Sequence, residues 1–274
     1  MSTRTVIALV GAATTLALAA GQGSALAAPD TTPPSLVTPA TADFVVGSTI
    51  GTMLPDADGP TSTGGIAMRA AWSATDASGV CGYSTRAEFG GGIGDWSAWS
   101  SATSLTDPGI TDYDDQFGGG SMKLDGYSVR ARDCAGNVSA AKVVSYRPVV
   151  AQENGATFQY GSVIGTPTYS GTWATASCSC FSGGQTRRTS VASGSVSFTG
   201  AQHHTGIVVA KGPDRGKVKV YVGGVLKATV DTYSSTKVNR AVVWNGVTSG
   251  ARVTLVDAAT PGHPRFDLDA VLVD

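Results

Sequence analysis

Apolar and polar residues alternate along the last third of the chain. Val218, Val220 and Val222 occupy every second position of one run, and Gly223-Gly224 follows them. A period of two residues indicates a strand with one buried face, and paired glycines are typical of a two-residue hairpin turn. The pattern predicts consecutive short strands at Lys217–Val222, Val225–Val230, Lys237–Trp244, Ala251–Val256 and Phe266–Val273.

The final predicted strand carries two acidic residues among apolar ones. Its alternation predicts one inward face, made of Phe266, Leu268, Ala270 and Leu272. Asp267 and Asp269 occupy the intervening positions. We therefore expect both carboxylates to face solvent or a loop.

Similar signals occur in the first half of the chain. Strands are predicted at Ile66–Ala74, Val80–Arg86, Tyr127–Arg132 and Lys142–Tyr146. Pro33-Pro34 precedes them and Arg147-Pro148 follows them, and proline does not join a central strand. We predict an all-β protein of two β-sandwich domains, 29–148 and 156–274, with a linker at 149–155.

Residues 1–28 are predicted to be a signal peptide. Arg4 precedes an apolar run at Val6–Ala20, and Ala25-Leu26-Ala27 offers a small-residue cleavage site. The run is too short and too rich in alanine and glycine to favour a membrane span. We expect cleavage after Ala27 or Ala28 and a secreted, extracellular protein.

Composition and charge refine this prediction. Only 14% of residues are charged, and the 36 glycines fit an all-β chain with many turns. Residues 30–150 hold 13 acidic and 7 basic side chains, whereas residues 151–274 hold 7 acidic and 11 basic ones. The basic second half favours anionic polymers at long range, although ordinary surface charge explains the same excess. Nucleic acid is not expected, because no dense Lys/Arg stripe is present and the pI is about 6.3.

Four cysteines are candidates for disulfides. Export permits such bonds, and Cys81, Cys134, Cys178 and Cys180 allow three connectivities. A bridge between Cys178 and Cys180 requires a sharp bend of the chain. A reducible bridge with a redox role is the alternative for this pair.

The segment Tyr127–Asn137 resembles the late strand and following turn of bacterial immunoglobulin-like and fibronectin type III-like domains. Trp72 together with Thr75–Val80 resembles their early strand. The likeness covers residues 31–148. Cys81 and Cys134 fall one on each resembling segment, which implies a bridge across the first sandwich and a second bridge between the remaining two cysteines.

Segments of the second half resemble secreted galactose-binding-like jelly-roll domains, a group that includes many carbohydrate-binding modules. They are Tyr169–Trp173, Ser182–Gly184, Val196–Phe198, Lys217–Val222, Thr229–Tyr233 and Asp267–Val271. The resemblance implies a jelly roll over residues 156–274 and a carbohydrate ligand.

The run Trp96–Ser100 matches W-S-x-W-S, a motif of cytokine-receptor fibronectin type III domains and of thrombospondin repeats. We predict that Arg130 and Arg132 interleave with its two tryptophans, because a guanidinium group over an indole ring is favourable. The motif precedes the arginine-bearing strand instead of following it, so receptor function is not implied. An exposed aromatic platform for sugars is the alternative.

Catalytic signatures are few. The chain has no G-x-S-x-G sequence and only three histidines, His203, His204 and His263. The first two lack the spacing that lets a pair of histidines bind one metal ion. We expect them to be a solvated pair in a loop, and no metal site is predicted there.

Asp112, Asp114 and Asp115 form the densest acidic group. Their polar, glycine-flanked loop does not suit the protonated acid of a glycosidase. Carboxylate oxygens can bind calcium, so a structural calcium ion is the alternative, and no other cofactor is expected.

Aromatic rings and arginines are the predicted ligand-binding groups, because sugars stack on rings and accept hydrogen bonds from arginine or asparagine. The candidates are Tyr169, Trp173, Phe181, Arg187, Arg188, Tyr233, Asn239 and Trp244. Packing in the core is the alternative for Trp173 and Trp244. The sequence predicts a secreted, non-catalytic protein that binds a carbohydrate or cell-envelope glycan. An adhesin-like role with a protein partner and an unrecognised hydrolase are the alternatives.

Overall fold

The computed structural model describes residues 28–36, 41–56, 59–63, 65–89, 92–110, 124–145, 148–155 and 164–274. Residues 1–27 of the predicted signal peptide and the acidic residues 112, 114 and 115 lie outside this part. Strands make up nearly all of the regular structure there, and its one helical element is the 3-10 turn η2 (Ser182–Gly184). The prediction of an all-β protein is confirmed. No helix among the described residues is long and apolar enough to cross a membrane.

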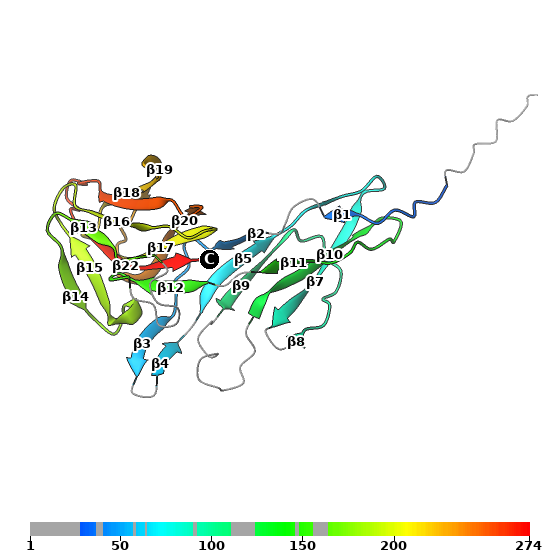
Figure 1. Cartoon of the computed structure of the whole chain (residues 1–274), viewed down its shortest axis with the longest axis horizontal. Helices are drawn as coiled ribbons and strands as arrows, with labels where there is room; N and C mark the ends of the chain where they lie inside the picture. Colours follow the sequence, from blue (N-terminus) through cyan, green and yellow to red (C-terminus); the bar gives the residue numbers. More distant parts are fainter. Residues whose placement is uncertain are drawn as a thin grey trace, which may run out of the picture. The chain divides into compact units, whose positions relative to one another are not determined.

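The first half contains two main sheets, with strand orders β2-β5-β9 and β11-β10-β7-β8 (Figure 1). Its strands are β1 (Ser35–Leu36), β2 (Thr41–Phe44), β3 (Thr52–Asp56), β4 (Gly59–Thr63), β5 (Ile66–Ala71), β6 (Ala74–Thr75), β7 (Val80–Phe89), β8 (Gly92–Ile93), β9 (Ser104–Ile110), β10 (Leu124–Asp133) and β11 (Lys142–Ser145). Val129 and Ala131 of β10 are buried, as their alternation predicts. The Cys81–Cys134 disulfide joins β7 to the turn that follows β10. The likeness to immunoglobulin-like domains stays a prediction.

The second half is a sandwich of two larger sheets. One has the order β14-β15-β22-β17-β20, with β12 also paired to β22, and the other has the order β13-β16-β21-β18-β19. The strands are β12 (Val149–Gln152), β13 (Thr168–Ser170), β14 (Ala174–Ser177), β15 (Gln185–Thr189), β16 (Ser195–Thr199), β17 (His204–Lys211), β18 (Lys217–Val222), β19 (Val225–Asp231), β20 (Val238–Val247), β21 (Arg252–Asp257) and β22 (Phe266–Val273). Gly223 and Gly224 both have positive φ, 57° and 81°, which the predicted hairpin turn between β18 and β19 requires.

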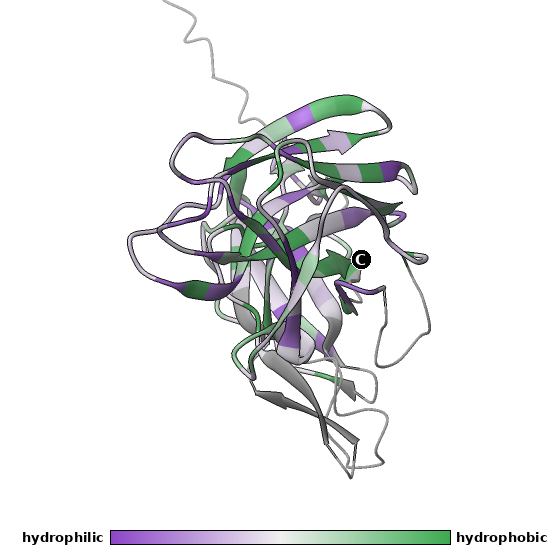
Figure 2. Cartoon of the chain, turned by 90° about the vertical axis from the view of Figure 1, so that its left-hand side faces the viewer, coloured by the Kyte–Doolittle hydropathy of each residue, from purple (hydrophilic) through white to green (hydrophobic). Residues whose placement is uncertain are grey.

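Alternation explains why these strands stack. Val218, Val220, Val253 and Leu255 are fully buried between the two sheets of the second half. Residues between them are exposed or half-buried, and Figure 2 shows green apolar positions interrupted by hydrophilic ones along the strands. Burial of each such side chain contributes about 1.5–3 kcal/mol.

The segment expected to be a linker is a strand for most of its length. Residues 149–152 form β12, which pairs with β22, and Val150 and Ala151 are fully buried. The prediction of a linker was wrong because a short apolar run after a proline can be either a connector or a short strand, and the sequence pattern alone does not distinguish the two. In the structure this run pairs with the last four residues of β22, beyond the part of β22 that pairs with β15.

One hydrophobic core crosses the predicted domain boundary. It contains Phe44 and Ile50 from the first half together with Val208, Val242 and Leu272 from the second. Backbone hydrogen bonds also connect the halves along the edge of β20, and residues 31–274 form one compact unit. The two halves therefore stabilise each other.

The final strand departs from the predicted alternation. Its pairing with β17 shifts register between Val208, which faces Ala270, and Val209, which faces Leu268, so Asp269 has no partner on that strand. Phe266 and Leu268 consequently pack between the two sheets, whereas Ala270 and Leu272 pack in the core shared with the first half. The prediction of a single inward face is wrong, because a β-bulge reverses the alternation.

Candidate functional site

A cavity of about 470 Å³ opens at the end of the second sandwich, where β14 and β15 meet the loops before β18 and β22. Ala174 and Arg188 lie on paired strands, and Arg188 is directly opposite Asp267 of β22. The lining residues are Thr172, Ala174, Arg188, Thr189, Ser190, Val191, Asp214, Pro264 and Arg265. Of the predicted site residues, only Arg188 lines this cavity.

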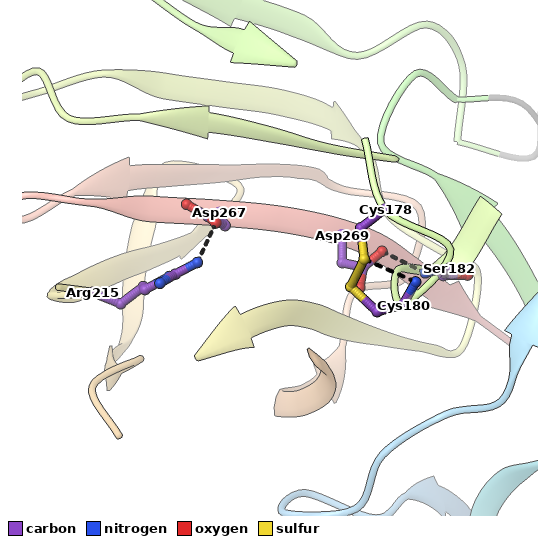
Figure 3. The surroundings of a disulfide bond; sticks show 6 residues. All are labelled: Cys178, Cys180, Ser182, Arg215, Asp267 and Asp269. Carbon is purple, nitrogen blue, oxygen red and sulfur yellow. Dashed lines mark hydrogen bonds and ion pairs between the residues drawn. A yellow bond between two sulfur atoms is a disulfide. The ribbon is translucent and has the colours of Figure 1, made fainter. Parts of the chain in front are cut away.

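A network of two arginines and two aspartates supports the cavity wall. Asp267 is fully buried, and its Oδ1 and Oδ2 accept hydrogen bonds from Nε and Nη2 of Arg265 at 2.6 and 2.7 Å. Nη2 of Arg215 donates a third bond to Asp267 Oδ2 at 2.9 Å (Figure 3). Asp214 accepts hydrogen bonds from both arginines and lies on the rim. The expectation that Asp267 faces solvent or a loop is wrong.

Charge pairing sets the ionisation of this network. Partial burial opposes the charged form of Asp214, but Arg215 and Arg265 outweigh it, and the pKa of Asp214 lies below its usual value. Burial likewise disfavours the charged Arg265, yet Asp267 and Asp214 raise its pKa. Both shifts favour the charged forms of Asp214 and Arg265 at neutral pH.

Three predicted ligand-binding residues meet at the open edge between the two sheets. The Tyr169 and Trp173 rings meet edge to face at 4.9 Å, and the Arg187 guanidinium lies 4.8 Å from the centre of the Tyr169 ring. Trp173 also contacts Phe266 of the core. Burial and the nearby Glu153 raise the pKa of Tyr169 despite Arg187. These contacts describe packing, so the core alternative for Trp173 fits its position.

The other four candidates are dispersed. Phe181 is buried before η2, and Asn239 and Trp244 are half-buried on β20, where Trp244 packs against the core. Tyr233 is 45% exposed and stacks edge to face on His263, whose neighbour Pro264 lines the cavity. Among the candidate aromatic residues, Tyr233 is therefore the one that is exposed and that contacts a sequence neighbour of a cavity-lining residue.

A second buried acidic group lies beside the Cys178–Cys180 disulfide loop (Figure 3). Asp269 is fully buried, so the expectation of a solvent-facing side chain is wrong here too. Its Oδ1 accepts the Ser182 N–H at 2.9 Å, whereas its Oδ2 and Gln152 Oε1 have no hydrogen-bond donor among the described residues. Burial raises the pKa of Asp269 well above its usual value and the nearby Glu153 adds to the shift, although the Ser182 N–H and Arg240 oppose it. Calcium takes about six to eight oxygen ligands, and these two oxygens alone do not supply that number.

The W-S-x-W-S segment forms the predicted ladder of tryptophans and arginines. Arg130 lies 4.1 Å from the centre of the Trp96 ring and 5.0 Å from that of Trp99, and Arg132 lies 4.8 Å from Trp99. Arg86 of β7 adds a further contact to Trp96 at 4.6 Å. The guanidinium groups occupy the ring faces, so the ladder reads as a structural element of the first sandwich.

The histidines are held by different partners. His204 begins β17, and its Nδ1 lies 3.1 Å from Asp43 Oδ1, while His203 is exposed. His263 Nδ1 lies 2.7 Å from the backbone oxygen of Pro213. The expected solvated loop therefore holds for His203 but not for His204.

Sequence reasoning missed most of the cavity wall. The available signal was the density of charge in two short loops, Pro213-Asp214-Arg215 and Pro264-Arg265, in a chain with only 14% charged residues. Because these loops are separated by about 50 residues, nothing local indicated that they meet.

No family model and no curated protein matches the chain. Among solved structures, it is similar to the CBM36-1 domain of a multidomain xylanase from the hindgut metagenome of Trinervitermes trinervoides, with 18% identity, 46% of this chain and 95% of that one covered, and a TM-score of 0.30. An exo-β-1,3-galactanase from Phanerochaete chrysosporium matches at 15% identity over 78% of this chain and 59% of its own, with a TM-score of 0.34. A Paenibacillus xanthan lyase matches at 14% identity over 82% of this chain and 25% of its own, with a TM-score of 0.35. Similarities of this size do not define what the chain binds.

Proposed function

We propose that this protein is a secreted, non-catalytic binding protein, and that its second sandwich recognises a carbohydrate or a cell-envelope glycan in the cavity beside Arg188. The observation that carries the proposal is the cavity itself. Its volume of about 470 Å³ lies in the range of roughly 300–1,000 Å³ that is usual for small-molecule sites.

The chemistry of the lining suits a sugar. Val191 and Pro264 offer apolar contact, while Arg188, Ser190 and Asp214 offer donors and acceptors for hydroxyl groups. Ligand pockets commonly combine apolar walls with a few polar groups that fix orientation. The exposed Tyr233 contacts the ring of His263, whose sequence neighbour Pro264 lines the cavity.

Preorganisation favours binding at this place. Arg265 is tied to Asp267 by two hydrogen bonds and to Asp214 by a third. A side chain that is fixed before binding loses little conformational entropy when the ligand arrives. The rim can therefore present Asp214 to a ligand at low cost.

The test is a glycan array followed by titration calorimetry on the chain that begins at residue 29. Ala174 is exposed and lines the cavity, so Ala174→Tyr should fill it and weaken glycan binding at least about tenfold, which is 1.4 kcal/mol. Ala140→Tyr, at an exposed position of the first half, is the matched control and should bind normally.

Two results would contradict the proposal. One is folded protein, verified by circular dichroism, that binds no glycan on the array. The other is glycan binding that Ala174→Tyr leaves unchanged. A protein partner recovered from envelope fractions, insensitive both to sugars and to Ala174→Tyr, would favour the adhesin-like alternative.

A further inference from the structure

Arg188 differs from every other charged residue in the cavity wall. It is exposed, and no hydrogen bond or ion pair to its guanidinium group is found among the described residues. Its neighbour Arg187 donates to Thr175 and stacks on Tyr169 instead. Arg188 is thus a cation that lines a cavity and has no partner there.

The rest of the wall does not neutralise this charge. Asp214 and Asp267 are balanced by Arg215 and Arg265, with which they form the buried network. Arg188 adds one positive charge that neither aspartate balances. Together with the two aspartates and the other two arginines, Arg188 gives this group of five side chains a net formal charge of +1.

The position of Arg188 on the sheet places this charge in the cavity wall. Arg188 lies between Ala174 of β14 and Asp267 of β22 in the register of the sheet. Residues directly opposite on antiparallel strands point to the same face. Ala174 and Arg188 both line the cavity, so the arginine stands on a rigid strand beside a small residue that leaves room in front of it.

We propose that the cavity selects sugars that carry an acidic group, and that Arg188 pairs with that group. The inference rests on the proposed function and adds the ligand class. A guanidinium group binds carboxylate, sulfate or phosphate through two parallel hydrogen bonds. The hydroxyl groups of Thr172 and Ser190 and the carboxylate of Asp214 remain for the neutral hydroxyls of the same sugar.

The experiment compares an acidic sugar with its neutral ester and with a sugar that carries a different acidic group. Titration calorimetry would measure Kd for tri-galacturonic acid, for its neutral methyl ester and for a sulfated galactose trimer. The proteins are the wild type, Arg188→Gln, Arg188→Lys and Arg252→Gln. Arg252 is exposed on β21 of the opposite sheet, so its variant removes the same charge away from the cavity.

We expect the acid to bind about tenfold more tightly than its ester, which is 1.4 kcal/mol. Arg188→Gln should remove this preference, Arg188→Lys should retain part of it, and Arg252→Gln should retain all of it. The preference should also weaken between about 0.15 M and 1 M salt, since the Debye length falls from about 8 to 3 Å. Equal binding of the uronate and the sulfated trimer assigns the preference to negative charge, and tighter binding of the uronate assigns it to the carboxylate.

The inference and the proposed function fail in different ways. If acid and ester bind equally, or if Arg188→Gln keeps the preference, the acidic class is wrong although glycan binding stands. If no glycan binds in a manner sensitive to Ala174→Tyr, the proposed function itself is wrong.

Discussion

Asp267 and Asp269 lie two residues apart on β22, and both are fully buried. The two oxygens of Asp267 receive hydrogen bonds from Arg265 and Arg215. Asp269 accepts a hydrogen bond from the Ser182 N–H, and the charge and backbone N–H of Arg240 offset only part of the effect of burial on its pKa. The same side chain on the same strand is therefore an ion-pair partner in one position and an acid with a raised pKa in the other.

The difference arises from what each position meets. Asp267 lies where β22 pairs with β15 and where two arginine-bearing loops converge. Asp269 lies at the register shift, between the part of β22 that pairs with β15 and the part that pairs with β12. A buried carboxylate stays ionised when opposite charge compensates its lost hydration, and otherwise takes up a proton. Neighbouring elements, not the strand, decide which of these occurs.

Replacing Asp267 should have the largest effect. Asp267→Asn keeps the shape but leaves Arg215, whose side chain is only 5% exposed, without its buried counter-charge. Removal of one partner from a buried ion pair typically costs about 3–5 kcal/mol. Urea unfolding would measure the loss, with Asp95→Asn at an exposed position as the control. A loss below about 1 kcal/mol would show that the network is not an ionic one.

Replacing Asp269 should have a smaller effect, and that effect should depend on pH. Its folded pKa is raised above the usual 3.8, chiefly by burial, so the folded protein binds the proton more tightly than the unfolded chain. The wild type should therefore lose stability as pH rises from about 3.8 toward the raised pKa. Asp269→Asn mimics the protonated acid and should remove this loss, with a gain of roughly 1–3 kcal/mol above that window.

The measurement for Asp269 is the free energy of unfolding by urea at several pH values for wild type and variant. Asp95→Asn again controls for the change of net charge. Parallel profiles for wild type and Asp269→Asn would mean that folding leaves the pKa of Asp269 unchanged, and the contrast with Asp267 would disappear.

Local patterns were enough to predict much of the fold. Alternating valines gave β18 with its observed bounds, and the order of apolar residues gave β22. The Trp/Arg ladder was also predictable, because the tryptophans lie in one short motif and the arginines alternate on one strand. Each of these features depends on residues close together in sequence.

Features that depend on distant segments were not predictable in this way. A β-bulge at Asp269 leaves no mark in the alternation, so the four apolar residues of β22 were predicted to share one inward face, whereas two of them pack in a different core. The arginines that pair with Asp267 come from position 215 and from the preceding loop, and only the fold brings both to one carboxylate. The cavity shares this origin, which is why Arg188 alone was foreseen among its lining residues.

The smallest expected effect concerns Glu153, which is buried near Asp269. Its negative charge contributes to the raised pKa of Asp269, and burial raises the pKa of Glu153 itself despite its backbone hydrogen bond and Arg187. Glu153→Gln should therefore lower the pKa of Asp269, because two buried acids no longer repel each other. The free energy of unfolding should then depend less on pH, with a change of less than about 1 kcal/mol. The double variant with Asp269→Asn measures the coupling, since the Glu153→Gln effect should shrink when Asp269 is already neutral. If the two effects add without interaction, Glu153 does not influence the protonation of Asp269. The contrast with Asp267 then rests on burial and on the other partners of each carboxyl group.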